Sequence, residues 1–230
     1  MKYITRNLEH VVSQVTKEYP VVLVTGPRQV GKTTMLLKLM DGTNRGYVTL
    51  DDWNERNIAK TDPELFLQLH KPPILIDEVQ YAPELFTYIK MHVDKTHEPG
   101  AFWLTGSQVF KLMKGVQESL AGRVAVLSLT SLSQAEICGG AMRPFTIDMD
   151  ALTARKAERT EADTRDIFER IYRGSMPTIV SGANSNSQIF YSSYLSTYIE
   201  RDVMELSDTI DSLKFFRFIT AVETGSQRCQ

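Results

Sequence analysis

The sequence predicts an α/β fold in which helices cover both faces of a parallel β-sheet. The first observation is a series of short, continuous apolar runs such as 21–25, which are typical of strands buried on both faces. The second is that segments with helical periodicity separate these runs, which favours parallel strands joined by right-handed crossovers. The chain has 230 residues, enough to bury a large core without disulfides or a structural metal.

Strands and helices are predicted to alternate regularly up to residue 140. A leading helix is expected first, and Asp62 with Pro63 marks the start of a later one, because aspartate is a good N-cap and proline fits the first helical position. The expected strands lie at 21–25, 46–52, 72–80, 100–108 and 122–130, and the expected helices at 7–18, 33–40, 62–70 and 82–95, with 110–120 as helix or loop and a short serine-capped helix within 131–140. Residues 1–140 are therefore assigned to one core domain.

The remainder of the chain has a different character. Residues 141–163 are polar and irregular, and we expect an exposed connecting segment there. Residues 164–230 have helical periodicity throughout, which predicts an all-helical region. The core is thus predicted to be followed by a connecting segment and a partial helical domain.

Composition and charge argue against several classes of protein. The formal net charge is -2, so no overall attraction to nucleic acid or to an anionic membrane is expected. The two cysteines, Cys138 and Cys229, form no CxxC pair, which fits a reducing compartment and argues against a zinc site. The chain has no apolar run of roughly 18 residues, and its start lacks the apolar core of a signal peptide. A cytoplasmic location is therefore expected.

A glycine-bracketed turn follows the first buried strand and matches the pattern G-x-x-x-x-G-K-[ST] in full. Backbone N–H groups of such a loop can point at an anion, and the start of the next helix adds positive potential. Lys32 is predicted to reach the β- and γ-phosphates of a nucleotide, and Thr33 to bind Mg²⁺. The predicted nucleotide-binding residues are Gly26, Pro27, Arg28, Gln29, Val30, Gly31, Lys32, Thr33 and Thr34. The alternative is a glycine-rich turn that binds no ligand.

Acidic and polar residues end two further predicted strands. Asp77 and Glu78 directly follow the apolar residues 74–76, so both are expected at the carboxyl edge of the sheet, beside the phosphate loop. Asp77 is predicted to hold Mg²⁺, and Glu78 to polarise an attacking water as a general base. Ser107 or Gln108, at the end of another predicted strand, can hydrogen-bond the γ-phosphate or the water, although a helix N-cap explains Ser107 equally well. The acids favour hydrolysis over phosphate transfer or a nucleotide switch.

Several motifs together resemble a prokaryotic family of AAA-like P-loop ATPases. They are GPRQVGKTT, LDD, ILIDEVQ, LTGSQ and ESLAGRV with LTSLSQAE, followed by RGSMP and YLSTYIERDV, which look like the start of that family's C-terminal domain of unknown function. The resemblance covers nearly the whole chain and implies an ATPase with a five-stranded sheet in the order 5-1-4-3-2. It implies that Ser107 senses the γ-phosphate, and it marks Arg123 as a candidate arginine finger. Members usually continue well beyond this length, which implies a truncated helical region here.

Two arginines outside the phosphate loop, Arg123 and Arg6, have positions that bear on nucleotide binding. Arg123 directly precedes the apolar run 124–129 of the fifth predicted strand, at the sheet edge opposite the phosphate loop. From there it can reach the phosphate of a neighbouring subunit more readily than that of its own chain. Pairing with a local carboxylate such as Glu118 is the alternative. Arg6 is considered as a neighbour of the adenine, because it lies just before the leading helix, but it is not retained as a site residue.

These inferences predict a cytoplasmic ATPase that binds ATP and Mg²⁺ and hydrolyses ATP to ADP and phosphate. The hydrolysis is expected to be coupled to an unidentified partner or nucleic-acid process. The guanine-reading motif N-K-x-D is absent from the sequence, which favours ATP over GTP. The alternative function is a nucleotide-dependent interaction module with little or no turnover. Self-association and a DNA or protein partner both remain open, and no membrane partner is expected.

Overall fold

The computed structural model describes residues 3–107, 109–140, 146–157 and 163–198, together with six residues between 214 and 221. Contacts between Cα atoms divide the chain into two compact units, which comprise residues 1–181 and residues 182–230. The first unit contains the sheet, the predicted phosphate loop and the predicted catalytic and magnesium-binding residues, so it is the part that bears on function. The boundaries assigned to the core, the connecting segment and the helical region stay predictions.

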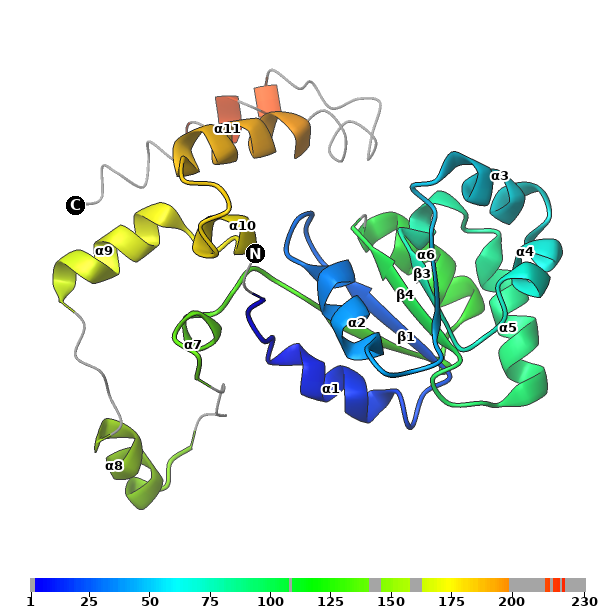
Figure 1. Cartoon of the computed structure of the whole chain (residues 1–230), viewed down its shortest axis with the longest axis horizontal. Coiled ribbons are helices and arrows are strands. Elements are labelled where there is room, and N and C mark those ends of the chain that lie inside the picture. Colours follow the sequence, from blue (N-terminus) through cyan, green and yellow to red (C-terminus); the bar gives the residue numbers. More distant parts are fainter. Residues whose placement is uncertain are drawn as a thin grey trace. The chain divides into compact units, whose positions relative to one another are not determined.

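The first unit is built on a five-stranded sheet whose order is β2-β3-β4-β1-β5. All four neighbouring pairs of strands are parallel. This confirms the predicted α/β class and the predicted order 5-1-4-3-2, which is the same order read from the other edge (Figure 1). The strands are β1 (Val21–Thr25), β2 (Gly46–Thr49), β3 (Ile74–Asp77), β4 (Phe102–Gly106) and β5 (Val124–Ser128).

The register of the strands brings their carboxyl ends to one edge of the sheet. Thr25 at the end of β1 pairs with Gly106 on one side and with Ser128 on the other. Thr49 pairs with Asp77 in the same way at the end of β3. Segments that follow β1, β3 and β4 therefore begin next to one another, although they are widely separated in the sequence.

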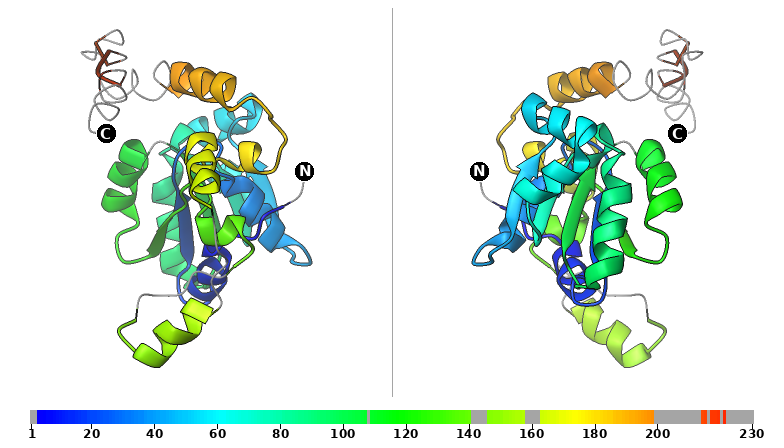
Figure 2. Two further views of the ribbon diagram at one scale, coloured as in Figure 1. Left: turned by 90° about the vertical axis from the view of Figure 1, so that its left-hand side faces the viewer. Right: turned by 90° about the vertical axis from the view of Figure 1, so that its right-hand side faces the viewer.

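Helices cover both faces of this sheet (Figure 2). One face packs Val21 and Leu23 of β1 into a cluster that includes Phe86 and Leu112. On the other face, the indole Nε1 of Trp103 donates to Thr16 Oγ1 at the end of the first helix, at 3.0 Å. The helices of this core are α1 (Leu8–Val15), α2 (Lys32–Met40), α3 (Trp53–Thr61), α4 (Pro63–Leu69), α5 (Leu85–Thr96), α6 (Val109–Ser119) and α7 (Gln134–Ile137), with a 3-10 turn, η1 (Val79–Tyr81).

Two helices differ from the sequence prediction. No element is predicted over residues 53–61, but α3 forms there because Asp52 caps it, its side chain accepting from Asn54 N at 2.7 Å and from Glu55 N at 3.3 Å. The segment expected to be irregular contains α8 (Met149–Ala157). Asp148 accepts from the N–H of Ala151 at 2.8 Å, so a local side-chain cap again starts a helix that has little apolar pattern.

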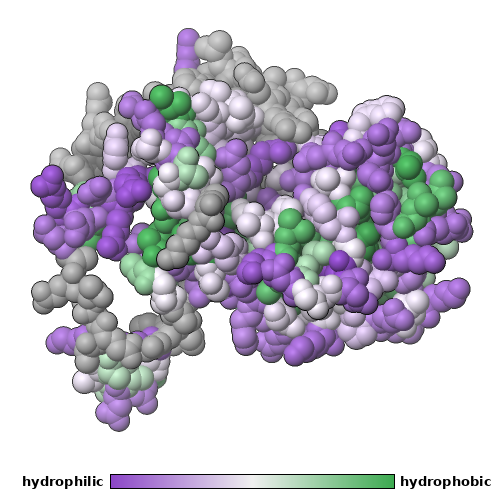
Figure 3. Space-filling model, in the orientation of Figure 1, coloured by the Kyte–Doolittle hydropathy of each residue, from purple (hydrophilic) through white to green (hydrophobic). Residues whose placement is uncertain are grey.

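The helical prediction for the later part of the chain is confirmed where the structure describes it. The helices are α9 (Thr164–Arg173), α10 (Pro177–Val180) and, in the second unit, α11 (Ser187–Tyr198). Residues 199–213 and 222–230 lie outside the described residues. On the face drawn in Figure 3, hydrophilic residues predominate and hydrophobic residues form small separate groups. Within the described residues, no helix has the length and apolar character needed to cross a membrane.

Candidate functional site

The predicted phosphate loop connects β1 to α2, and its shape depends on its two glycines. Gly26 has φ 140° and Gly31 has φ 91°, both in the region that favours glycine. A Cβ on Gly26 would lie 2.0 Å from the carbonyl oxygen of Leu129, so no side chain fits at that position. Gly31 is also the N-cap of α2. The helix α2 therefore begins directly at the end of the loop, and its N-terminus contributes positive potential there.

Lys32 lies across this loop and is only 6% exposed. Its ammonium group donates to the carbonyl oxygens of Gly26, at 3.0 Å, and Pro27, at 2.9 Å. The charged end of the side chain is therefore held over the loop backbone rather than directed into solvent. A lysine ammonium in this position fits the recognition of phosphate as a point charge.

The two predicted magnesium ligands are in direct contact. Thr33 Oγ1 donates to Asp77 Oδ1 at 2.7 Å, which joins the start of α2 to the end of β3. Asp77 is 6% exposed, and the hydroxyl of Thr105 on β4 donates to the same Oδ1. Hydroxyl and carboxylate oxygens are the ligand type that Mg²⁺ prefers. The donor set at this point therefore fits a magnesium ion that retains several waters.

Glu78 lies beside this pair, and Ser107 points at it. Glu78 has φ 56°, a left-handed backbone conformation that turns the chain out of β3. Its N–H donates to Thr105 Oγ1 at 3.1 Å, and its Oε2 accepts from Ser107 Oγ at 3.2 Å. The amide Nε2 of Gln80 donates to the same Oε2. The carboxylate of Glu78 is thus held at the sheet edge by side chains from η1 and from the segment after β4.

Sequence reasoning missed Thr105 and Gln80 in this group. Thr105 is fully buried, and its hydroxyl donates to Asp77 while it accepts from the N–H of Glu78, so it links the two acids. A threonine near the end of an otherwise apolar strand, and a glutamine two residues after Glu78, were available as signals. Gln108, the other candidate after β4, lies outside the described residues. The role of Ser107 toward a phosphate stays a prediction.

Arg123 is not brought together with these residues. It directly precedes β5, and its carbonyl oxygen accepts from Val21 N at the start of β1, at the opposite edge of the sheet. Its guanidinium donates to both carboxylate oxygens of Asp94 on α5, at 2.5 and 3.1 Å. The described carboxylate partner of Arg123 is thus Asp94 rather than Glu118. The hydrogen bond raises the pKa of Arg123 and lowers that of Asp94. A role for Arg123 in a neighbouring subunit stays a prediction.

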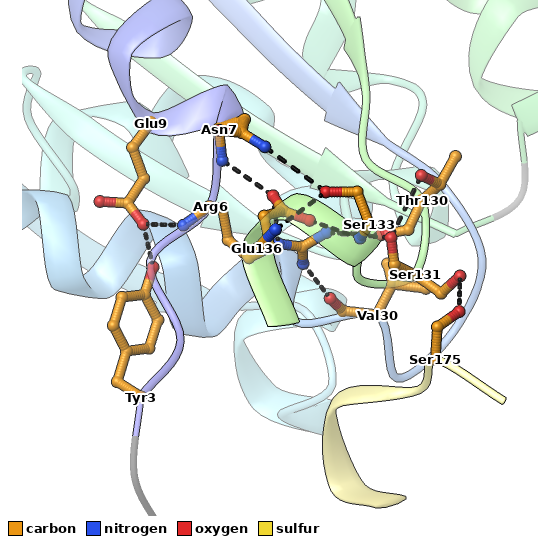
Figure 4. A network of polar contacts seen from close by, with 10 residues as sticks. All are labelled: Tyr3, Arg6, Asn7, Glu9, Val30, Thr130, Ser131, Ser133, Glu136 and Ser175. Carbon is orange, nitrogen blue, oxygen red and sulfur yellow. Dashed lines mark hydrogen bonds and ion pairs between the residues drawn. The ribbon is translucent and has the colours of Figure 1, made fainter. Parts of the chain in front are cut away.

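Arg6, which sequence reasoning did not retain, contacts the phosphate loop from the side (Figure 4). Its side chain is 5% exposed, and Nη1 donates to the carbonyl oxygen of Val30 at 2.7 Å. Nε forms an ion pair with Glu136 Oε1 at 3.1 Å, and Nη2 donates to the carbonyl oxygen of Thr130 at 2.8 Å. The partners are 24, 130 and 124 residues away in the sequence, which leaves no local pattern that could have revealed them.

A cavity of about 140 Å³ lies next to the end of the phosphate loop. Its walls come from the N-terminal segment, from the loop and α2, and from the segment around α10. The residues that line it include Tyr3, Ile4, Val30, Thr34, Leu132 and Pro177. A mostly apolar cavity beside a phosphate site has the character expected for the binding of an aromatic base.

Comparison with known proteins gives matches in both parts of the sequence. A family model of the AAA domain matches residues 18–138, and a model of a domain of unknown function matches residues 164–227. The uncharacterized proteins Rv2008c of Mycobacterium tuberculosis and Mb2031c of Mycobacterium bovis are each 32% identical over 190 residues. These alignments cover 81% of this chain and 37% of each relative, so the chain spans little more than a third of their length.

Among solved structures, the Walker-type ATPase PABY2304 of Pyrococcus abyssi resembles this chain with a TM-score of 0.52. The match covers 89% of this chain and 75% of that protein, at 15% sequence identity. At that identity the likeness concerns the fold, and it agrees with the sheet described above.

Proposed function

This chain belongs to the AAA domain family, and on that premise we propose that it binds ATP with Mg²⁺ and hydrolyses ATP to ADP and phosphate. The observation that carries the proposal is the contact between Thr33 and Asp77, at 2.7 Å, with Lys32 and Glu78 at the same edge of the sheet. Four side chains of complementary chemistry converge there from two segments that are far apart in the sequence, the start of α2 and the end of β3. Packing alone does not require polar groups of these types at one point.

Each residue has a role that follows from its position. The loop amides and Lys32 bind the β- and γ-phosphates, because N–H dipoles and a buried ammonium both favour an anion. Thr33 and Asp77 would hold Mg²⁺, which when bound neutralises charge on the phosphates. Glu78 orients a water and accepts its proton as a general base. Ser107 hydrogen-bonds the γ-phosphate in the ATP-bound state.

The adenine base is assigned to the cavity next to the loop. Val30 and Thr34 line it at the phosphate end, and Tyr3 and Ile4 supply apolar surface from the N-terminal segment. A base in this cavity and phosphates in the loop are compatible with a single nucleotide, because the cavity borders Gly31 at the end of the loop.

Steady-state release of phosphate from ATP tests the proposal. Lys32→Ala should lose most of its affinity for ATP, because the point charge at the phosphates is removed. Glu78→Gln should bind ATP with Mg²⁺ as the parent does but hydrolyse it at least about a hundredfold more slowly, because an amide cannot accept the proton. Lys38→Ala and Glu84→Gln are matched controls, since both residues are exposed and lie outside the site.

The results separate hydrolysis from the alternative function. Binding of ATP by the parent without release of phosphate, with DNA absent or present, would favour the nucleotide-dependent interaction module. Equal ATP affinity in Lys32→Ala and the parent would reject the phosphate site itself. Candidate partners are DNA, a protein or a second copy of the chain. Each is tested by adding it to the assay, or by raising the protein concentration, and measuring the change in turnover.

A further inference from the structure

We propose that Arg6 is a positioning residue that directs a backbone N–H of the phosphate loop toward the phosphates of the bound nucleotide. The proposal rests on the proposed function and deepens it. Arg6 lies outside the sequence motif, but its guanidinium reaches the loop at the carbonyl oxygen of Val30, 2.7 Å away (Figure 4). That carbonyl belongs to the peptide unit that joins Val30 to Gly31, directly before Lys32.

The geometry of a peptide unit connects this contact to the phosphates. The Val30–Gly31 peptide is trans, so its C=O and its N–H point in opposite directions. A hydrogen bond that draws the Val30 carbonyl toward Arg6 therefore turns the N–H of Gly31 away from Arg6. Gly31 has φ 91°, one of several backbone conformations open to glycine, so a contact from outside the loop helps to hold this one. Arg6 supplies that contact.

Other contacts fix the guanidinium itself. Glu136 pairs with Nε at 3.1 Å, and the carboxylate is fixed in turn by the N–H groups of Asn7, at 2.8 Å, and Ser133, at 2.7 Å. Nη2 donates to the carbonyl oxygen of Thr130 at 2.8 Å. All three nitrogens of the planar guanidinium, Nε, Nη1 and Nη2, therefore donate hydrogen bonds at the same time. Lysine has a single ammonium and cannot reproduce this arrangement, although it keeps the charge.

The same residue also borders the cavity assigned to the base, which suggests a second explanation. Arg6 lines that cavity together with Tyr3 and Ile4. If Arg6 acted only on the shape of the cavity, its loss would weaken the binding of a nucleotide and leave the phosphate loop intact. A ligand that has phosphates but no base separates these two explanations.

The experiment compares the binding of ADP and of inorganic triphosphate by calorimetry. Arg6→Lys and Arg6→Ala should each lower the affinity for both ligands by about tenfold to a hundredfold, which is the range expected for one hydrogen bond to a charged group. Arg45→Ala is the matched control, because Arg45 also donates to backbone carbonyls, those of Gly100 at 2.8 Å and Ile74 at 3.4 Å, but at the opposite edge of the sheet. It should leave both affinities unchanged.

Further readouts exclude a merely structural effect. Calorimetry reports the fraction of competent sites separately from the affinity, so a variant with an irreversibly misfolded fraction shows fewer sites with the parent's dissociation constant. Urea unfolding of the same samples shows whether a reversibly unfolded population lowers the apparent affinity. In glycine-labelled protein, the amide resonance of Gly31 should shift when triphosphate binds to the parent, and this shift should be reduced in Arg6→Lys.

The outcomes are distinct. Weaker binding of both ligands, with full occupancy and a reduced shift at Gly31, supports the proposal. Loss of ADP affinity with unchanged triphosphate affinity overturns it in favour of the cavity, and fewer sites at unchanged affinity overturns it in favour of folding alone. Failure of the parent to bind either ligand rejects the proposed function together with this role of Arg6. Normal binding by parent and variants rejects the role of Arg6 only.

Discussion

Gln80 offers a sharp test of how the carboxylate of Glu78, the proposed general base, is oriented. Its Nε2 donates to Glu78 Oε2 and lies 3.5 Å from Ser107 Oγ, while its Oε1 is buried and has no hydrogen-bond partner within the described structure. The orientation of the amide is set by its neighbour, because the reverse orientation would place an oxygen against the carboxylate. Gln80→Leu keeps much of the volume of the side chain and removes both polar atoms.

The expected magnitudes follow from these contacts. A hydrogen bond to a charged group contributes about 1.5–3 kcal/mol, but Ser107 still donates to Glu78, at 3.2 Å, so only part of the orientation is lost. We expect turnover to fall by about tenfold, which corresponds to about 1.4 kcal/mol in the barrier. The free energy of unfolding should stay the same or rise, because an unsatisfied buried oxygen costs about 1–3 kcal/mol and is removed.

The assay measures single-turnover hydrolysis at saturating ATP, with ADP affinity and urea unfolding measured on the same samples. Gln68→Leu is the control, because it makes the same chemical change at an exposed position of α4. Parental turnover in Gln80→Leu, together with slow turnover in Glu78→Gln, would refute the reasoning, since Glu78 would then be oriented without Gln80. A fall in ADP affinity equal to the fall in turnover would also refute it.

Two further predictions concern Arg123 and Glu136. If Arg123 acts on the phosphate of a neighbouring subunit, turnover per subunit should rise with protein concentration, and Arg123→Ala should abolish that rise and lower turnover by up to about 10³-fold. Mixing Arg123→Ala with Glu78→Gln should then restore activity. No recovery on mixing and no concentration dependence would leave Arg123 only its ion pair with Asp94, 2.5 Å away. Burial raises the pKa of Glu136, but the N–H groups of Ser133 and Asn7 and the guanidinium of Arg6 outweigh burial and lower it. Because the folded-state pKa is lowered, the contribution of Glu136 to stability is present above the ordinary glutamate pKa of about 4.3 and is lost as the pH falls through the lowered value. The free energy of unfolding in urea should therefore depend less on pH in that acidic range for Glu136→Gln than for the parent. An equal dependence in parent and variant would contradict the assignment.

Much of the site could be predicted from the sequence, because its key residues are set by local patterns and by one rule of sheet geometry. The spacing of Gly26, Gly31, Lys32 and Thr33 defines a loop with little dependence on the remainder of the chain. Apolar runs ahead of Asp77 indicate a buried parallel strand, and parallel strands end at the same edge. The position of Asp77 beside the loop therefore follows from the topology, and in the structure Thr33 Oγ1 donates to Asp77 Oδ1 at 2.7 Å.

Helix boundaries were less predictable where side-chain caps replaced apolar periodicity. Asp52 and Asp148 start α3 and α8 in segments that have a weak apolar pattern, so hydrophobic periodicity missed them. A search for capping residues alone would have produced many false starts, because aspartate is also common in turns.

The sequence by itself determined the fold class and the chemistry available at the carboxyl edge of the sheet, because both depend on short-range patterns repeated along the chain. Only the tertiary structure decided which distant groups support that chemistry. Arg6 reaches Val30 and Glu136 across 24 and 130 residues, and Arg123 pairs with Asp94 across 29. Such partners depend on the path of the whole chain. A side chain's hydrogen-bonding groups are the same in every sequence, but their neighbours exist only after the core has packed.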